Sequence, residues 1–252
     1  METQPVDFIS AKNFFDSAKI IFQRYNIKTL TTIDEFINYI KGYDYTISVK
    51  ENNFIDKNIL DEKLKLIWHA AAGSQTEIAN FLIYYSKFNH KNPETDIDTL
   101  NRTLCSHHLS MSYESIYRVW EKATHVLYYL HYKDINKTIY YNEIVDRLNR
   151  ANKYESSCIK ALKSHIKHWD KIAKIRNKYS HEECKLFNYE FKPSTILNSY
   201  GLPYSWNEES TDFKAECSIL INRYHHLVNL NNTLIKFLNN FPESTLINPN
   251  KV

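Results

Sequence analysis

Apolar residues recur at intervals of three and four along most of the chain, a spacing that places them on one face of an α-helix. This spacing predicts helices over residues 6–25, 32–40, 59–88, 110–132, 138–150, 155–182 and 212–240. Gly73-Ser74 is expected to kink or divide the helix over 59–88. Only Tyr45-Thr-Ile-Ser-Val alternates as a short strand or an extended crossing does. An all-α fold is therefore expected.

Two polar segments interrupt the helical pattern. Residues 89–108 contain Pro93 and are predicted to form a long loop. Residues 184–211 are rich in aromatic residues and contain proline and glycine, and so long a segment inside a domain is usually functional. We expect it to be a lid or a dimer contact.

The pattern also divides the chain into three parts. Residues 1–58 are expected to form a helical extension packed on the core, 59–241 the main helical bundle, and 242–252 a tail.

Composition narrows the class of protein. With 3 glycines and 6 prolines in 252 residues, the chain lacks the tight turns that an all-β or Rossmann fold requires. No apolar run approaches the roughly 18 residues of a membrane span, and no secretion signal is evident at the N-terminus. A cytoplasmic protein that does not contact the membrane is expected.

Metal and cofactor chemistry receives no support from the sequence. The four cysteines are far apart and form no C-x2-C pair, so they are expected to be reduced, buried residues rather than zinc ligands. They are Cys105, Cys158, Cys184 and Cys217. The doublets His107-His108 and His225-His226 have no nearby ligand partners in the sequence and are expected at the surface or an interface. We expect neither a metal nor a cofactor.

The helix predicted over 155–182 carries the most informative chemistry. Its apolar positions are Ile159, Leu162, Ile166, Trp169, Ile172 and Ala173. Arg176 falls on the same register, although its guanidinium stays charged and therefore needs an anionic partner or a wet cleft. Asn177 and His181 lie beside it. Arginine, asparagine and histidine at one helix end can bind a phosphodiester and move protons on it, which indicates RNA chemistry.

The stretch Arg176-Asn177-Lys178-Tyr179-Ser180-His181 resembles the R-x4-6-H signature of the HEPN (higher eukaryotes and prokaryotes nucleotide-binding) superfamily. The resemblance implies a helical bundle, usually a homodimer, and metal-independent ribonuclease activity of the kind found in toxin–antitoxin, abortive-infection and CRISPR effector systems. It implies catalytic roles for Arg176, Asn177 and His181.

A second stretch, Ser115-Ile-Tyr-Arg-Val-Trp-Glu121-Lys-Ala, resembles an earlier helix of abortive-infection-type members, in which an acidic residue faces the site. This resemblance implies that Glu121 holds Arg176 in place. In members controlled by nucleotidyltransferase antitoxins, a tyrosine follows the histidine by two positions. Glu183 stands there in this chain, which argues against that mode of regulation.

Other residue pairs also fit, or nearly fit, the arginine–histidine pattern. Arg102 precedes His107 and His108 in the predicted loop. Arg118 and His125 are seven apart, so both lie on one face of the helix predicted over 110–132. The long amphipathic helix, the arginine in its apolar seam and the adjacent asparagine favour Arg176 and His181. In the alternative interpretation, Arg176 simply pairs with a core carboxylate.

A lysine stripe accompanies the motif, formed by Lys160, Lys163, Lys167, Lys171, Lys174 and Lys178. Between residues 157 and 179 these lysines and Arg176 are the positive charges, and Asp170 is the one acidic residue. The local charge is therefore +6, in a chain whose net charge is +3. Such a stripe neutralises phosphates, although a solvated helix face has the same composition. We expect Lys167, Lys171, Lys174 and Lys178, with Tyr179 as a base-stacking residue, to bind RNA.

The predicted reaction is RNA cleavage by the 2′-hydroxyl. It needs a base, an acid and a cation beside the phosphorane, and one chain offers a single motif histidine, so a two-fold dimer is expected to complete the site. Residues five apart on an unbroken helix point about 140° from each other, so Arg176 and His181 converge in one chain only if the helix ends or bends between them.

The predicted function is an endoribonuclease that serves as a toxin or phage-defence effector, with an antitoxin or defence protein as a further partner. A non-catalytic module that binds RNA or a protein is the alternative, and a purely structural bundle is the third interpretation.

Overall fold

The computed structural model describes residues 11–28, 48–49, 53–54, 57–87, 96–132, 139–152, 154–181 and 213–239. These residues are helical apart from short connections and one two-stranded antiparallel pair, β1 (Ser48–Val49) with β2 (Asn53–Phe54). The helices are α1 (Ala11–Arg24), α3 (Lys57–Tyr85), α4 (Asp96–Tyr132), α5 (Tyr141–Arg150), α6 (Ser156–Ser164), α7 (Ile166–His181) and α8 (Phe213–Asn239). The expected all-α class is confirmed.

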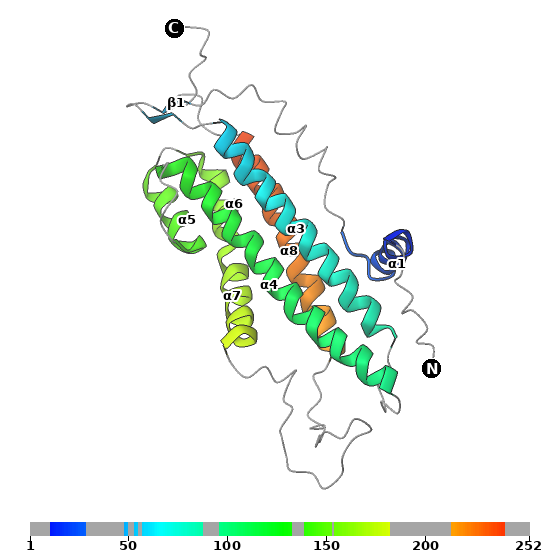
Figure 1. Ribbon diagram of the computed structural model, residues 1–252. Helices are drawn as coiled ribbons and strands as arrows, with labels where there is room; N and C mark the ends of the chain where they lie inside the picture. Colours follow the sequence, from blue (N-terminus) through cyan, green and yellow to red (C-terminus); the bar gives the residue numbers. More distant parts are fainter. Residues whose placement is uncertain are drawn as a thin grey trace.

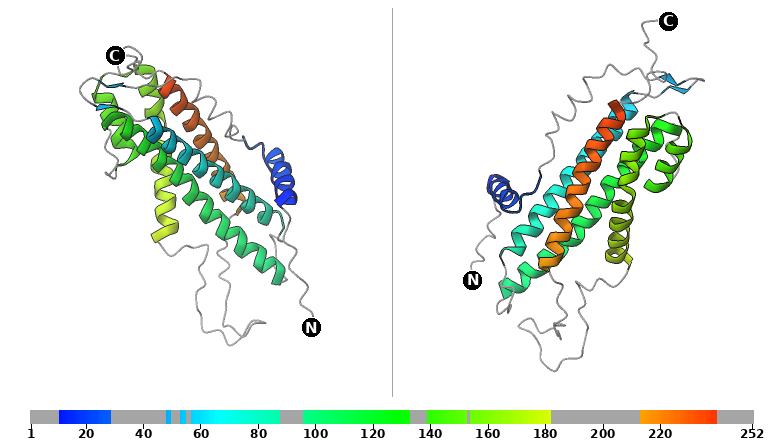
Figure 2. Two further views of the ribbon diagram at one scale, coloured as in Figure 1. Left: turned by 45° about the horizontal axis from the view of Figure 1, so that its top comes forward. Right: turned by 180° about the vertical axis from the view of Figure 1, so that it is seen from behind.

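The long helices α3, α4 and α8 lie side by side and form the body of the molecule (Figure 1). Helix α4 packs against α3, α5, α7 and α8, so it is the central element. Helix α1 packs on α3 at the outside of this bundle (Figure 2). Helix α7 lies beside α4 on the other side, which positions the motif helix against the central one.

The core lies where the apolar stripes of these helices meet. On α4, the fully buried Ile116, Trp120, Ala123 and Leu127 are spaced four, three and four apart, as a single helix face requires. The Trp120 ring meets the Tyr141 ring edge-on, with centroids 5.0 Å apart. The apolar spacing in the sequence therefore builds the interior as expected.

Helix α3 is continuous through Gly73, so the predicted interruption at Gly73-Ser74 is wrong. The Ser74 hydroxyl is buried and donates to the Ala70 carbonyl oxygen at 3.0 Å, within the helix. A serine that bonds back to its own helix needs no break in the chain to be satisfied.

Replacing Gly73 with alanine is expected to raise the free energy of unfolding by about 1 kcal/mol. A Cβ at this position meets no heavy atom within 4 Å, so alanine gains helix propensity without a clash. Urea unfolding of Gly73→Ala beside the wild type measures the effect. A loss of stability would show that α3 needs the flexibility of glycine.

Helix α4 begins at Asp96, so the loop predicted to reach residue 108 is wrong from that point onward. Contacts with α3 stabilise this polar start: Cys105 is fully buried with its thiol 3.8 Å from the Phe81 carbonyl oxygen, and His108 Nδ1 lies 2.8 Å from a Glu77 carboxylate oxygen. Tertiary packing thus overrides a weak local helix signal. His108 therefore has a carboxylate partner, which the sequence did not indicate.

The predicted helix over 155–182 is divided at His165 into α6 and α7. The Ser164 hydroxyl donates to the Ala161 carbonyl oxygen at 2.7 Å, and the His165 amide donates to the Leu162 carbonyl oxygen, a tighter turn than an α-helix makes. His165 Nε2 lies 3.0 Å from Thr233 Oγ1 on α8. This contact fixes the side chain at the break.

Lowering the pH is expected to destabilise the protein through His165. Burial, and secondarily His226, lower the pKa of His165 from 6.5 to about 4. The neutral His165 side chain contributes fully to stability above pH 6.5, the pKa of this residue in the unfolded chain. This contribution is lost as the pH falls from 6.5 toward 4, and the loss in the free energy of unfolding is about 3 kcal/mol. Urea unfolding across this pH range measures the slope. The His165→Gln variant should lose stability less steeply than the wild type, and equal slopes would contradict the prediction.

Several expectations lie outside the described residues: the helix over 32–40, the alternating residues before Ser48, the segment 184–211, Cys184 and the tail 242–252. The cysteines Cys105, Cys158 and Cys217 are buried free thiols, as expected. In the described part of the chain, no helix is long and apolar enough to cross a membrane.

Candidate functional site

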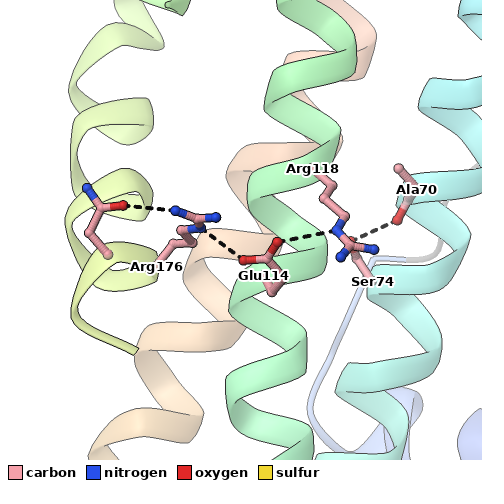
Figure 3. Close-up of polar contacts among 6 residues, drawn as sticks. Ala70, Ser74, Glu114, Arg118 and Arg176 are labelled. Atoms are coloured by element: carbon pink, nitrogen blue, oxygen red, sulfur yellow. Dashed lines mark hydrogen bonds and ion pairs between the residues drawn. The ribbon is translucent and has the colours of Figure 1, made fainter. Parts of the chain in front are cut away.

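Arg176 lies in the last turns of α7 and faces α4. Its Nε donates to Oε2 of Glu114 at 3.0 Å, and the two side chains are 28% and 23% exposed (Figure 3). The guanidinium therefore has the anionic partner that its place in an apolar seam requires. The alternative interpretation of Arg176 also predicts a carboxylate partner. The ion pair alone therefore does not distinguish a site for RNA from plain packing, and the groups around the pair have to be compared.

Glu114 bridges two arginines. Its Oε1 accepts from Nε of Arg118, one turn later on α4, at 3.3 Å, while Oε2 holds Arg176 (Figure 3). Arg118 is 59% exposed. Glu121, whose pKa burial raises, lies near enough for the charges of Lys122, Arg176 and Arg118 to oppose that rise, so two carboxylates and three cations gather around this site.

An aromatic pair supports the same guanidinium. Arg176 Cζ lies 5.0 Å from the centroid of the Tyr117 ring, within the range of a cation–π contact. The Tyr117 ring stacks on Trp169 of α7, with centroids 5.1 Å apart, and Trp169 is buried. Arg176 is thus held by a carboxylate and by a ring that is itself fixed by the core.

Asn177 is exposed next to this group. Its Oδ1 accepts from Nη1 of Arg176 at 3.3 Å, so the two predicted site residues lie in contact. Asn177 and His181 are four apart on α7 and share a helix face.

Glu114 forms an ion pair with Arg176, and Glu121, which the resemblance implies as the residue that holds Arg176, also interacts with it through charge, because Arg176 opposes the rise that burial causes in the pKa of Glu121. The two glutamates are seven apart and share one face of α4. Glu121 is half-buried, and burial, together with Glu114, raises its pKa against the opposing effect of Lys122 and Arg176. The i,i+4 pair of Glu114 and Arg118 is a signal in the sequence that pointed to this site.

Helix α7 runs without a break to His181, so no helix end separates Arg176 from His181. On a regular helix, two positions five apart point about 140° from each other. The break or bend that would let the two side chains converge within one chain is therefore absent from the backbone of α7. The side chains of Lys178, Tyr179 and His181 lie outside the described residues.

The lysine stripe is exposed where it is described. Lys160 and Lys163 lie on α6, and Lys167, Lys171 and Lys174 lie on α7. The division at His165 places the stripe on two helices rather than on one. The last described lysine on α7, Lys174, precedes Arg176 by two residues and points to a different side of the helix.

Of the competing pairs, only Arg118 lies at the candidate site, where it pairs with Glu114. Arg102, His107 and His108 lie within α4 rather than in a loop. His125 is half-buried, and burial lowers its pKa, with Lys122 and Lys63 acting in the same direction. Among the described residues, no group of three or more His, Cys, Asp or Glu side chains is placed to hold a metal ion.

Comparison of the chain with protein-family models, curated proteins and solved structures finds no match. The class of protein that the fold defines is an all-α helical protein. Its candidate site is the group formed by Glu114, Tyr117, Arg118, Arg176 and Asn177 between α4 and α7.

Proposed function

We propose that this protein is a metal-independent endoribonuclease of the HEPN type that acts as a homodimer. The observation that carries the proposal is the fixed guanidinium of Arg176, which Glu114 and Tyr117 hold at a half-exposed position beside Asn177 near the end of α7. A cation fixed in advance stabilises the developing charge of a phosphorane better than a mobile one does.

In this reaction the 2′-hydroxyl attacks the adjacent phosphorus, its proton passes to a base, and an acid protonates the departing 5′-oxygen. The products are a 2′,3′-cyclic phosphate and a 5′-hydroxyl. Arg176 would stabilise the phosphorane, and His181 would carry a proton. Because α7 continues unbroken to His181, we infer that the arginine of one copy works with the histidine of the other across a two-fold axis.

The biological role that fits such an enzyme is a toxin or a phage-defence effector, held in check by an antitoxin or a defence partner protein. An unrestrained ribonuclease without sequence-specific contacts damages the cell that makes it. The exposed lysines of α7 would supply sequence-independent affinity for RNA.

Incubating the purified protein with total RNA in EDTA tests the activity. Cleavage that leaves 2′,3′-cyclic phosphate ends, and that is lost in both His181→Ala and Arg176→Ala, is the expected result. Lys65→Gln, at an exposed lysine of α3, is the matched control and should cleave normally. Intact RNA with wild-type protein that is folded and dimeric would overturn the proposal.

A second candidate is a module that binds RNA without cleaving it. The pairing of Arg176 with Glu114 favours it, because a guanidinium that already has a carboxylate partner can serve packing and phosphate capture alone. In the same assay this candidate predicts intact RNA that migrates more slowly in a native gel. A structural bundle predicts neither cleavage nor retardation.

A further inference from the structure

Three histidines gather between α7 and α8, and we call them the histidine seam: His165, His168 and His226. The rings of His168 and His226 stack with centroids 3.3 Å apart and planes 25° from parallel. The rings of His165 and His168 have centroids 6.4 Å apart. His226, expected at the surface or an interface, thus stacks on a ring of α7.

Hydrogen bonding leaves part of this seam unsatisfied. Thr233 Oγ1 donates to the Asn229 carbonyl oxygen, so it accepts from His165, whose proton is then on Nε2. His165 Nδ1 is left as a bare, buried acceptor in a side chain only 7% exposed. Within the described part of the chain, Nδ1 of His168 and Nε of Arg223 are also buried without a hydrogen-bond partner. Unpaired buried polar atoms are costly and need an explanation.

Among the described residues, the charged groups that act on the seam are basic. Lys167 and Lys171 approach from α7, and Arg223 and His225 approach from α8, with Lys28 beyond His225. From α4, the contact with His165 is the uncharged ring of Trp120. Burial, and after it His226, Lys167, His165 and Arg223, together lower the pKa of His168 to about 4, and among the described residues no carboxylate acts in the opposite direction. The described groups around the seam thus leave its positive charges without an anionic partner.

We propose that the histidine seam, with Arg223, Lys167 and Lys171, is a second phosphate-binding site, which holds the backbone of the RNA strand that reaches Arg176. Arginine and lysine supply the fixed charge, and the imidazoles supply hydrogen-bond donors. The inference rests on the proposed function for its ligand.

The position on α7 supports this assignment. His168 precedes Arg176 by eight residues on the same helix, which is a rise of about 12 Å along its axis. Exposed Lys171 and Lys174 lie between the two. A flexible single strand can span this rise, and it has to pass around α7 to do so, because Lys171 and Arg176 are five apart and point about 140° from each other.

Phosphate binding at this site is coupled to the uptake of protons by the imidazoles. A phosphate beside the rings offsets the repulsion from Lys167 and Arg223, so it raises the imidazole pKa values toward their ordinary range. The complex therefore takes up protons, and affinity increases as the solution becomes mildly acidic.

Sulfate, a divalent oxyanion that does not titrate in this range, tests the site independently of any cleavage. Histidine Cε1–H resonances are followed against pH in sodium sulfate and in sodium chloride of equal ionic strength. We expect His168 and His226 to titrate at higher pH in sulfate, and His131, which bonds Tyr154 elsewhere, to titrate equally in both. Arg223→Gln should abolish the sulfate effect, and Lys65→Gln should keep it. Equal titration of His168 and His226 in the two salts would overturn the proposal.

A 2′-O-methyl oligonucleotide, which lacks the attacking hydroxyl, separates RNA from a small free oxyanion. Fluorescence anisotropy should show binding weakened about tenfold by Arg223→Gln and by Lys167→Gln, more at low salt, and unchanged by Lys65→Gln. If sulfate shifts the histidine titrations but these variants bind the oligonucleotide as the wild type does, the site binds a small oxyanion, and the assignment to RNA is overturned. Binding that passes this test while total RNA stays uncleaved would instead refute the nuclease and leave this site standing.

Discussion

Replacing Trp120 with alanine is expected to lower the free energy of unfolding by about 3–5 kcal/mol. Trp120 is 1% exposed at the centre of α4, and its ring contacts Tyr141 of α5, His165 at the break between α6 and α7, and Trp169 of α7. The change removes a large buried ring and leaves a cavity at the junction of four helices, which the surrounding side chains cannot fill. Urea unfolding followed by far-UV circular dichroism measures the effect.

Leu66→Ala is the matched control, because Leu66 is 48% exposed on α3 and fills no core space. We expect its effect to stay within about 0.5 kcal/mol of the wild type. A Trp120→Ala protein that unfolds at nearly the same urea concentration as Leu66→Ala would show that the helices do not meet at Trp120.

Replacing Glu114 with alanine is expected to reduce RNA cleavage about a hundredfold, chiefly in kcat. Glu114 holds Nε of Arg176 and of Arg118, so its loss lets the Arg176 guanidinium leave the orientation that the reaction needs. The effect on stability should be small, about 1 kcal/mol or less, because these ion pairs are partly exposed and screened by solvent. Single-turnover cleavage and urea unfolding give the two quantities separately.

Comparing the change in kcat with the change in the free energy of unfolding shows whether Glu114 positions Arg176 for the reaction or only stabilises the fold. Glu62→Ala, which removes an exposed glutamate from α3, serves as the control for the change in charge. If Glu114→Ala lost stability while it cleaved RNA at the wild-type rate, Glu114 would be a structural residue, and the role proposed for Arg176 would fail with it.

Helix periodicity predicted the described helices wherever a strong apolar stripe exists, as on α4 around Trp120 and on α8. The errors fall where contacts distant in sequence decide the local structure. Helix α4 reaches back to Asp96 because Cys105 and His108 pack on α3, a contact that the polar composition of 96–108 does not reveal. The break at His165 depends on Thr233, 68 residues away.

The candidate site was only partly predictable, because its geometry also depends on contacts between residues distant in sequence. The register of Arg176 within an apolar seam indicated that it needs an anionic partner, and the structure provides one. The identity of the partner depends on the relative position of α4 and α7 along their axes, which the spacing of residues in the sequence does not determine. Glu114 and Glu121 share a face, so periodicity alone does not choose between them. The stacking of His168 on His226 joins residues 58 positions apart and had no sequence signal.

The unbroken course of α7 to His181 has a genetic consequence if the site is shared between two copies. A chain altered at Arg176 would still fold and pair, because Arg176 is half-exposed and the core does not depend on it. In a cell that makes both forms, the altered chain would draw wild-type chains into mixed pairs whose cleavage centres lack one arginine. Such an allele would therefore be dominant over the intact gene, and its excess would protect the cell from the enzyme.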